Sequence, residues 1–247
     1  MEEENPLRMN QNNLLDETVF NKILKNDSEI DLIPKSGKYD YVFIFIHGLF
    51  GKPEDYMNIF NKKDGPIPDK FKIVLPCAPN VYVSRLNSNT TSWFDLTGIN
   101  NDVIKEKNIS FKDMEKNGGK IKQLIRDEAQ KLNNDFSKIF LGGYSQGACL
   151  SYHVGLSFDF TLGGIVCFCG IPVSQTQIKK NRDKELNILS IAGGKDIYFP
   201  IDYLKNQTKN ILHNFTKLHL KEFLNEGHAV TESELKEMKK FIDFLIK

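Results

Sequence analysis

The clearest pattern along the chain is a series of short apolar runs separated by segments of helical periodicity. The run at 41–46, YVFIFI, is rich in β-branched and aromatic residues and stands just before Gly48. A continuous apolar run of this length is typical of a strand buried on both faces of a sheet. Similar runs predict further strands at 71–76, 138–143, 163–170 and 186–194.

Helical patterns lie between and after these runs, at 52–62, 119–134, 145–156, 201–215 and 231–247. In the last of them, Thr231 is followed three residues later by Glu234, which is the signature of a capping box at a helix start. Buried strands that alternate with helices favour a mostly parallel central sheet with helices on both faces. Because the chain has 247 residues and no evident internal repeat, we expect one main α/β domain.

Two polar segments fall outside this alternation. Residues 1–38 show only a weak helical pattern over 14–25, and we interpret them as an N-terminal extension to an α/β domain at 39–247. Residues 97–120 carry no strand pattern, which favours a surface loop with short helical pieces. Two roles stay open for this loop: a lid near the mouth of a site, or a solvated connection.

The charge and the N-terminal residues narrow the partners and the compartment. The formal net charge is +1, so no basic field favours nucleic acid. The N-terminus lacks a cationic segment followed by an apolar run, and position 2 is Glu rather than a myristoylatable Gly. Every apolar run is far shorter than the roughly 20 residues of a membrane span. We therefore expect a cytoplasmic protein without stable membrane insertion, of undetermined oligomeric state.

The four cysteines sit among apolar or small residues, at Cys77, Cys149, Cys167 and Cys169. Buried reduced thiols are favoured in such surroundings over disulfides or a metal site. The chain also shows no clustered spacing typical of zinc ligands. We expect a protein that works without a metal and without a cofactor.

The segment 143–147 reads Gly-Tyr-Ser-Gln-Gly, a Gly-x-Ser-x-Gly pattern. A predicted strand precedes it and a helical pattern follows it. This context is typical of a nucleophile elbow, in which a sharp turn lifts the serine hydroxyl above the sheet and the glycines leave room for the backbone. Ser145 is therefore the candidate nucleophile.

A serine hydroxyl needs a base that takes its proton and a carboxylate that orients the base. His228 is favoured as the base because it lies on a Gly-flanked loop before the final helix, at the sheet edge where α/β proteins place ligands. Structural roles are favoured for the other histidines, His47, His153, His213 and His219. The candidate acids between Ser145 and His228 include Asp159, Asp183, Asp196 and Asp202. Asp196 is favoured because it directly follows the strand at 186–194, which gives the Ser, acid, His order of this hydrolase architecture.

Acyl transfer also needs backbone donors for the oxyanion that forms when the serine attacks a carbonyl. The N–H of Gln146, directly after the nucleophile, is one candidate. The N–H of Leu49, in the loop after the first strand, is the other. His47 and Gly48 would shape this loop rather than exchange protons.

The motifs HGL, SWFDLTG, LGGYSQGA, CGIP, NILSIAGGKDIYFP and GHAV occur in this order between about residue 41 and the C-terminus. With these motifs the chain resembles the acyl-protein thioesterase, phospholipase and carboxylesterase family of small serine hydrolases. The resemblance implies an α/β-hydrolase fold with a triad of Ser145, Asp196 and His228, and an oxyanion hole made by Leu49 and Gln146. It also implies cleavage of thioesters or esters of medium or long acyl chains, with S-acylated proteins as a leading substrate class.

Two residues are candidates for substrate binding. Trp93 in SWFD matches the tryptophan that this family has near its acyl pocket, although a sole tryptophan is by itself more often a core residue. Phe50 and Gly51 replace the Gly-Asp that follows HGL in the family, so we expect Phe50 to reshape one wall of the pocket. The segment AGGKDIYFP keeps the aspartate and final proline of the family's HGDxDPxVP.

Two other functions are compatible with these residues. The first is a lysophospholipase or general short-chain carboxylesterase that acts on acyl-ester lipids or small esters. The second is a hydrolase-fold module that binds a lipid or a partner without turnover. The complete set of triad residues argues against the second, because a binding module has no chemical need for all three side chains.

Overall fold

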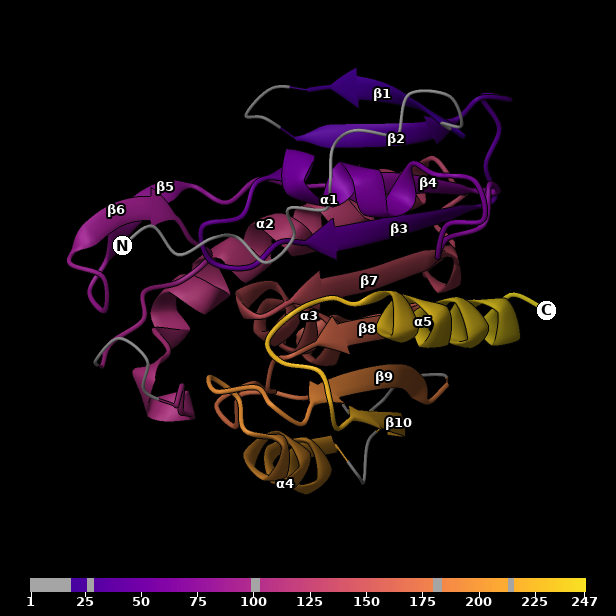
Figure 1. Ribbon diagram of the computed structural model, residues 1–247. Coiled ribbons are helices and arrows are strands. Elements are labelled where there is room, and N and C mark those ends of the chain that lie inside the picture. Colours follow the sequence, from indigo (N-terminus) through magenta and orange to yellow (C-terminus); the bar gives the residue numbers. More distant parts are fainter. Residues whose placement is uncertain (1–18, 26–28, 99–102, 180–183, 213–215) are drawn as a thin grey trace.

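A central sheet in the strand order β1-β2-β4-β3-β7-β8-β9-β10 organises the molecule in the computed structural model (Figure 1). The structure describes residues 19–25, 29–98, 103–179, 184–212 and 216–247. The strands of this sheet are β1 (Phe20–Leu24), β2 (Ile30–Pro34), β3 (Tyr41–Ile46), β4 (Phe71–Leu75), β7 (Ile139–Tyr144), β8 (Gly164–Phe168), β9 (Leu186–Gly193) and β10 (Thr216–Phe223). Neighbouring strands are parallel from β4 to β10, whereas β1 and β2 form an antiparallel edge. The predicted mostly parallel sheet is confirmed.

Helices cover both faces of this sheet, as the alternation along β3 shows. The helices are α1 (Pro53–Phe60), α2 (Phe111–Gln130), α3 (Gln146–Ser157), α4 (Ile201–Leu212) and α5 (Glu232–Leu245). Val42, Ile44 and Ile46 of β3 pack in one core cluster with apolar residues of α2, α3 and α4. Phe43 and Phe45 pack in a second cluster with residues of α1 and α5. Successive strand side chains point to opposite faces, so the continuous apolar run fills two cores.

The N-terminal segment differs from its prediction. The weak helical pattern over 14–25 gives way to strand at Phe20, and β1 pairs with β2, which pairs with β4. The helical interpretation was wrong there because only Phe20 of β1 is buried, while Ile23 and Leu24 are exposed; an edge strand does not need apolar alternation. Residues 1–18 lie outside the described residues. The domain boundary at residue 38 stays a prediction.

The prediction of a loop over 97–120 holds only for part of its length. Helix α2 begins at Phe111, and the side chain of Ser110 caps it by accepting a hydrogen bond from Asp113 N. Gly118 and Gly119 obscured the helical pattern. Gly118 is needed where α2 crosses α3, because a Cβ there would lie 2.9 Å from the ring of His153. The described remainder contains the short 3-10 helix η3 (Glu106–Asn108), and residues 99–102 lie outside the described part.

Three smaller elements complete the described structure: the hairpin of β5 (Asn80–Val83) and β6 (Ser88–Thr91), and the 3-10 helix η4 (Phe136–Lys138). The capping box predicted at the start of α5 is confirmed, since Thr231 N donates to Glu234 Oε2 at 2.8 Å. Within the described ranges, no helix combines the length and apolarity needed to cross a bilayer.

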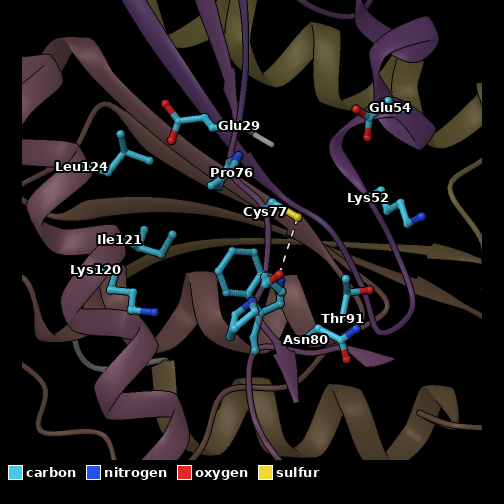
Figure 2. A pocket seen from close by; sticks show the side chains of 13 residues that line it. Glu29, Lys52, Glu54, Pro76, Cys77, Asn80, Thr91, Lys120, Ile121 and Leu124 are labelled. Carbon is cyan, nitrogen blue, oxygen red and sulfur yellow. Dashed lines mark hydrogen bonds between the residues drawn. The ribbon is translucent and has the colours of Figure 1, made fainter. Parts of the chain in front are cut away.

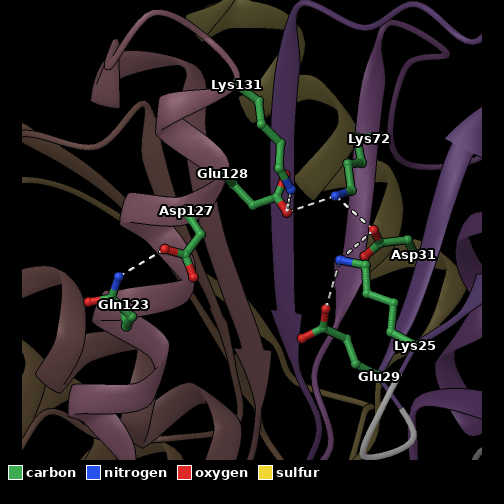
Figure 3. Close-up of polar contacts among 8 residues, drawn as sticks. All are labelled: Lys25, Glu29, Asp31, Lys72, Gln123, Asp127, Glu128 and Lys131. Atoms are coloured by element: carbon green, nitrogen blue, oxygen red, sulfur yellow. Dashed lines mark hydrogen bonds and ion pairs between the residues drawn. The ribbon is translucent and has the colours of Figure 1, made fainter.

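A buried ionic cluster ties the antiparallel edge to the rest of the fold (Figure 3). The ammonium group of Lys72, on β4, lies 2.7 Å from a carboxylate oxygen of Asp31 on β2 and 2.7 Å from one of Glu128 on α2. Lys25 and Lys131 contact the same two acids from the rim, at 2.8 and 2.6 Å. Because desolvating these charges is costly, each acid depends on its lysine partner. The cluster therefore fastens the N-terminal hairpin and α2 to β4.

Candidate active site

Ser145 stands in a sharp turn between β7 and α3. Its backbone has φ 55° and ψ −116°, a conformation that costs a non-glycine residue about 1 to 3 kcal/mol. The flanking glycines permit the turn: a Cβ on Gly143 would lie 2.4 Å from the backbone of Gly147, and a Cβ on Gly147 would lie 1.9 Å from Ile46 O. The strand, turn and helix predicted around the serine are present.

The structure brings Ser145, His228 and Asp196 together in one hydrogen-bonded line. His228 Nε2 lies 2.9 Å from Ser145 Oγ, and His228 Nδ1 lies 2.8 Å from Asp196 Oδ2. An ionised carboxylate only accepts hydrogen bonds, so Nδ1 carries the proton of the neutral ring and Nε2 is left to accept the serine proton. The arrangement holds the imidazole in the tautomer that a general base needs.

The carboxylate of Asp196 is itself held in place. Its other oxygen, Oδ1, accepts hydrogen bonds from the backbone N–H groups of Tyr198 and Phe199, both at 2.9 Å. The rings of these two residues also contact the imidazole of His228, with ring centres 5.0 and 5.9 Å away. Only 14% of the His228 side chain is exposed. Asp196 and most of the His228 side chain are therefore shielded from water.

His47 takes a different role at the end of β3. Its Nε2 accepts a hydrogen bond from Ala78 N at 2.9 Å, so Nδ1 carries the proton and donates to Gly48 O at 2.7 Å. Burial lowers the pKa of His47 to about 4. The ring is thus neutral and fully used in holding the loop that contains Leu49. His153 and His219 also lie away from Ser145, on α3 and β10, and His213 lies outside the described residues.

The two candidate oxyanion donors flank the serine. Gln146 is the first residue of α3, where backbone N–H groups have no partner within the helix. The loop with Leu49 lies on the other side: a Cβ on Gly48 would come within 3.2 Å of Ser145 Cβ. Phe50, the next residue, has a positive φ of 63°, and its N–H donates to Thr91 O at 3.1 Å. Phe50 is 48% exposed, so its ring stands at the surface beside the loop.

The side chain of Gln146 has a role that the sequence analysis missed. Its amide nitrogen donates to Ser92 Oγ at 3.0 Å and to Phe94 O at 2.9 Å, while its oxygen accepts from Trp93 N at 3.0 Å. Trp93 is buried, and its ring N–H donates to His47 O at 2.8 Å. Trp93 is therefore fixed both to α3, through Gln146, and to the loop that contains Leu49, through His47. No sequence motif encodes contacts between side chains more than fifty positions apart.

A groove of about 900 Å³ opens beside this site, between the end of β4 and helix α2 (Figure 2). Trp93 lines it, together with apolar residues that include Pro76, Ile121 and Leu124. Lys52 and Lys120 stand on opposite sides of the groove. Among the described residues that line it, none belongs to the line of Ser145, His228 and Asp196.

Cys169 completes a set of potential metal ligands with Asp196 and His228, since their ligand atoms all lie within 4.8 Å of one another. The chemistry of the donors does not fit a metal. Burial holds the pKa of the Cys169 thiol well above its ordinary value, whereas metals bind the thiolate. Asp196 and His228 already bind each other. All four cysteines are free thiols; three are buried as predicted, but Cys77 is partly exposed.

Comparison with known proteins shows the family and the fold of the chain. The chain is 28% identical to acyl-protein thioesterase 1 of Candida albicans over 215 residues, which cover 83% of this chain and 91% of that protein. Its fold is similar to that of Arabidopsis thaliana SOBER1, with a TM-score of 0.70, 21% identity, and coverage of 84% of this chain and 99% of that one. It is also similar to Zea mays acyl-protein thioesterase 2, with a TM-score of 0.72, 16% identity, and coverage of 89% and 99%. The phospholipase/carboxylesterase family model matches residues 28–246, and the chain therefore belongs to the phospholipase/carboxylesterase family of hydrolases.

Proposed function

We propose that this chain is a serine hydrolase that cleaves acyl thioesters or carboxylic esters, with S-acylated proteins as the leading substrate class. The observation that carries the proposal is the hydrogen-bonded line from Ser145 Oγ through His228 to Asp196. Each of the three groups has the geometry its role requires. The name of the Candida albicans relative, an acyl-protein thioesterase, supports the substrate class.

In the proposed reaction, Ser145 Oγ attacks the acyl carbonyl while its proton passes to His228 Nε2. Asp196 stabilises the imidazolium that results. The backbone N–H groups of Leu49 and Gln146 stabilise the oxyanion, and each such donor is worth about 100- to 1,000-fold in rate. His228 then gives its proton to the leaving thiol or alcohol. In the second half of the reaction, water attacks the acyl-enzyme carbonyl and gives its proton to His228, which returns it to Ser145 Oγ as the acid leaves.

The position of the groove relative to the serine supports a second function. The groove that contains Trp93 offers an acyl chain an apolar wall of Pro76, Ile121 and Leu124, although charged residues also line it. Phe50, exposed in the loop after Leu49, is our candidate for a further contact with the chain. Ser145 is not among the described residues that line this groove, so the groove does not begin at the serine. This favours the general short-chain carboxylesterase of the alternative; a lysophospholipase would need a long-chain groove as well, because its substrate carries one long acyl chain.

We place the protein in the cytoplasm, acting without a metal or cofactor and without nucleic acid as a partner. The four free cysteines support a reducing compartment. We assign the hydrolase domain to residues 39–247, with the preceding residues as an N-terminal extension. Strands β1 and β2 of this extension pack on the sheet.

The test is covalent labelling with an acyl phosphonate, read by intact mass. The wild-type protein should gain one adduct, and Ser145→Ala should gain none. Ser151→Ala is the matched control, because Ser151 is a buried serine of the same helix whose hydroxyl donates to Gly147 O; it should label like the wild type. An unlabelled wild type, or an adduct on Ser145→Ala, would contradict the proposal.

The substrate class needs a second measurement. Hydrolysis of short p-nitrophenyl esters, a lysophospholipid and a palmitoyl-peptide thioester would be compared as kcat/KM. We expect the thioester to be the best substrate. A kcat/KM for the thioester far below that for the short esters would reject the leading class in favour of the alternative.

A further inference from the structure

The loop around His228 is held to the sheet through three consecutive carbonyl oxygens. The hydroxyl of Tyr144 donates to His228 O at 2.7 Å. The thiol of Cys169 lies 3.7 Å from the carbonyl oxygens on either side, those of Gly227 and Ala229. We infer that Tyr144 and Cys169 are positioning residues that set the ring of His228 in line with the nucleophile. The inference rests on the function proposed above.

Tyr144 is placed to serve both sides of the site. It is the last residue of β7 and directly precedes Ser145. Its ring centre lies 5.0 Å from that of His228, and on another side a Cβ on Gly48 would lie 3.0 Å from the same ring. Burial raises the pKa of Tyr144 well above its ordinary value, so the phenol keeps its proton and donates it. The side chain of Tyr144 therefore contacts both the loop of His228 and the loop that contains Leu49.

Cys169 lies directly after β8, in the neighbouring position of the sheet. Its N–H donates to Ile191 O at 3.0 Å, and its backbone has a positive φ of 50° that turns the thiol toward the loop. The thiol is fully buried and protonated, so it acts as a weak donor rather than a nucleophile. Its one proton is shared between two carbonyl oxygens. We therefore expect a smaller contribution from Cys169 than from Tyr144.

The contacts of Tyr144 and Cys169 hold a part of His228 that Asp196 does not touch, its backbone. Asp196 holds the imidazole at Nδ1, and the rings of Tyr198 and Phe199 pack against it, but none of these contacts fixes the backbone of His228. The contacts at the carbonyl oxygens fix the backbone of His228 instead. A displacement of about 1 Å between reacting groups costs about 100-fold in rate. The contacts on the ring and those on the backbone together restrain both ends of His228.

The main test is Tyr144→Phe, which removes only the hydroxyl. We expect kcat to fall about tenfold, the rate equivalent of one hydrogen bond, with KM within about twofold. Phosphonate labelling of Ser145 should slow by the same factor. Tyr152→Phe is the control, because Tyr152 is also a buried tyrosine. Its hydroxyl donates to Ser190 Oγ at 2.7 Å, a contact that does not involve the loop of His228. It should lose similar thermal stability and keep the wild-type kcat.

The second test separates the thiol from its volume. Cys169→Ala should lower kcat about threefold, and Cys169→Ser should restore most of it because a hydroxyl keeps a donor. Cys167→Ala is the control: Cys167 is a buried thiol of β8 whose sulfur contacts Ala148 O at 3.6 Å instead. It should keep the wild-type kcat. This series decides the question even where Tyr144→Phe does not fold.

The inference is overturned if Tyr144→Phe turns over as fast as Tyr152→Phe, or if Cys169→Ser loses as much activity as Cys169→Ala. In both cases the proposed function stands, provided that the wild type is active and Ser145→Ala is not. If the wild type neither hydrolyses any substrate nor takes the phosphonate, the proposed function itself fails, and the positioning role falls with it.

Discussion

The loops that carry His47 and His228 lie at the same edge of the sheet, yet only one leaves a ring nitrogen for chemistry. Both nitrogens of His47 are bound to backbone groups, of Gly48 and Ala78. In His228, one nitrogen is bound to a carboxylate and the other faces Ser145 Oγ. Both rings are largely shielded from solvent, so burial does not distinguish them. What distinguishes the structural histidine, His47, from the proposed base, His228, is the nature of their partners.

The largest expected effect comes from removing the charge that orients His228. Asp196→Asn should lower kcat by about 10⁴-fold, because an amide neither fixes the Nδ1–H tautomer nor stabilises the imidazolium. The fold should be kept, since the amide has the shape of the carboxylate. Steady-state kinetics would be compared with Asp202→Asn, an exposed acid of α4 that the sequence also offered. A loss below about tenfold would contradict the assignment.

A smaller effect, mainly on stability, is expected from His47→Ala. The substitution removes two buried hydrogen bonds and leaves a cavity, so the free energy of unfolding should fall by about 2 to 4 kcal/mol. Looser placement of the loop with Leu49 should lower kcat/KM about 10- to 100-fold in the folded protein. Urea unfolding and kinetics would measure both. A 10⁴-fold loss of kcat with unchanged stability would instead make His47 the base.

The same variant tests the charge state of His47. Because burial holds its folded pKa at about 4, below the ordinary 6.5, its contribution to stability is complete above pH 6.5 and is lost as the pH falls toward 4. The loss reaches about 3 kcal/mol. His153, whose pKa burial also lowers to about 4, adds the same trend, while Glu234, whose pKa burial raises to about 7, makes stability fall as the pH rises from 4.5 to 7.

Since His153 and Glu234 are present in both proteins, the difference between the wild type and His47→Ala isolates His47. Urea unfolding at pH 4.5, 5.5 and 6.5 should show a shallower dependence on pH in the variant. Parallel curves for the two proteins would mean that the pKa of His47 is the same in the folded and the unfolded state, against the lowered pKa expected here.

The smallest effect is expected from Phe50→Gly, which acts on the loop of His47. Glycine accepts a φ of 63° without strain, so the free energy of unfolding should rise by up to about 1 kcal/mol. If the exposed ring contacts the acyl chain, KM for long-chain esters should rise about threefold, while short esters are unaffected. Asp64→Gly, at a φ of 57° in a turn after α1, is the control for strain alone. Equal KM values for both variants would exclude Phe50 from the pocket.

The central part of the fold was predictable because parallel strands buried on both faces leave a strong local signal. β3, β7 and β8 appear as continuous apolar runs, and β4 and β9 as runs that are mostly apolar. The meeting of Ser145, Asp196 and His228 was predictable for a related reason. Each follows a strand, and parallel strands deliver the residues after them to one edge.

The features that were missed depend on contacts between distant residues. β1 needs no apolar alternation because it lies at the edge, and the first half of α2 carries two glycines, of which the crossing with α3 explains Gly118 only. The hydroxyl of Tyr144 reaches a carbonyl oxygen 84 positions away, and the thiol of Cys169 reaches others 58 and 60 positions away. Hydrophobic periodicity carries no information on such contacts.

The ionic cluster at Lys72 has a consequence for where the chain can be cut. Asp31 lies before residue 39 but within the family-matched region, as do its partner Lys72 and the other acid, Glu128. A shortened protein that begins at residue 39 would keep every residue of the proposed triad but would lose β2 and, with it, Asp31, one of the two acids that contact Lys72. A shortened protein meant to keep the fold should therefore start before β1, although the catalytic motifs begin only at about residue 41.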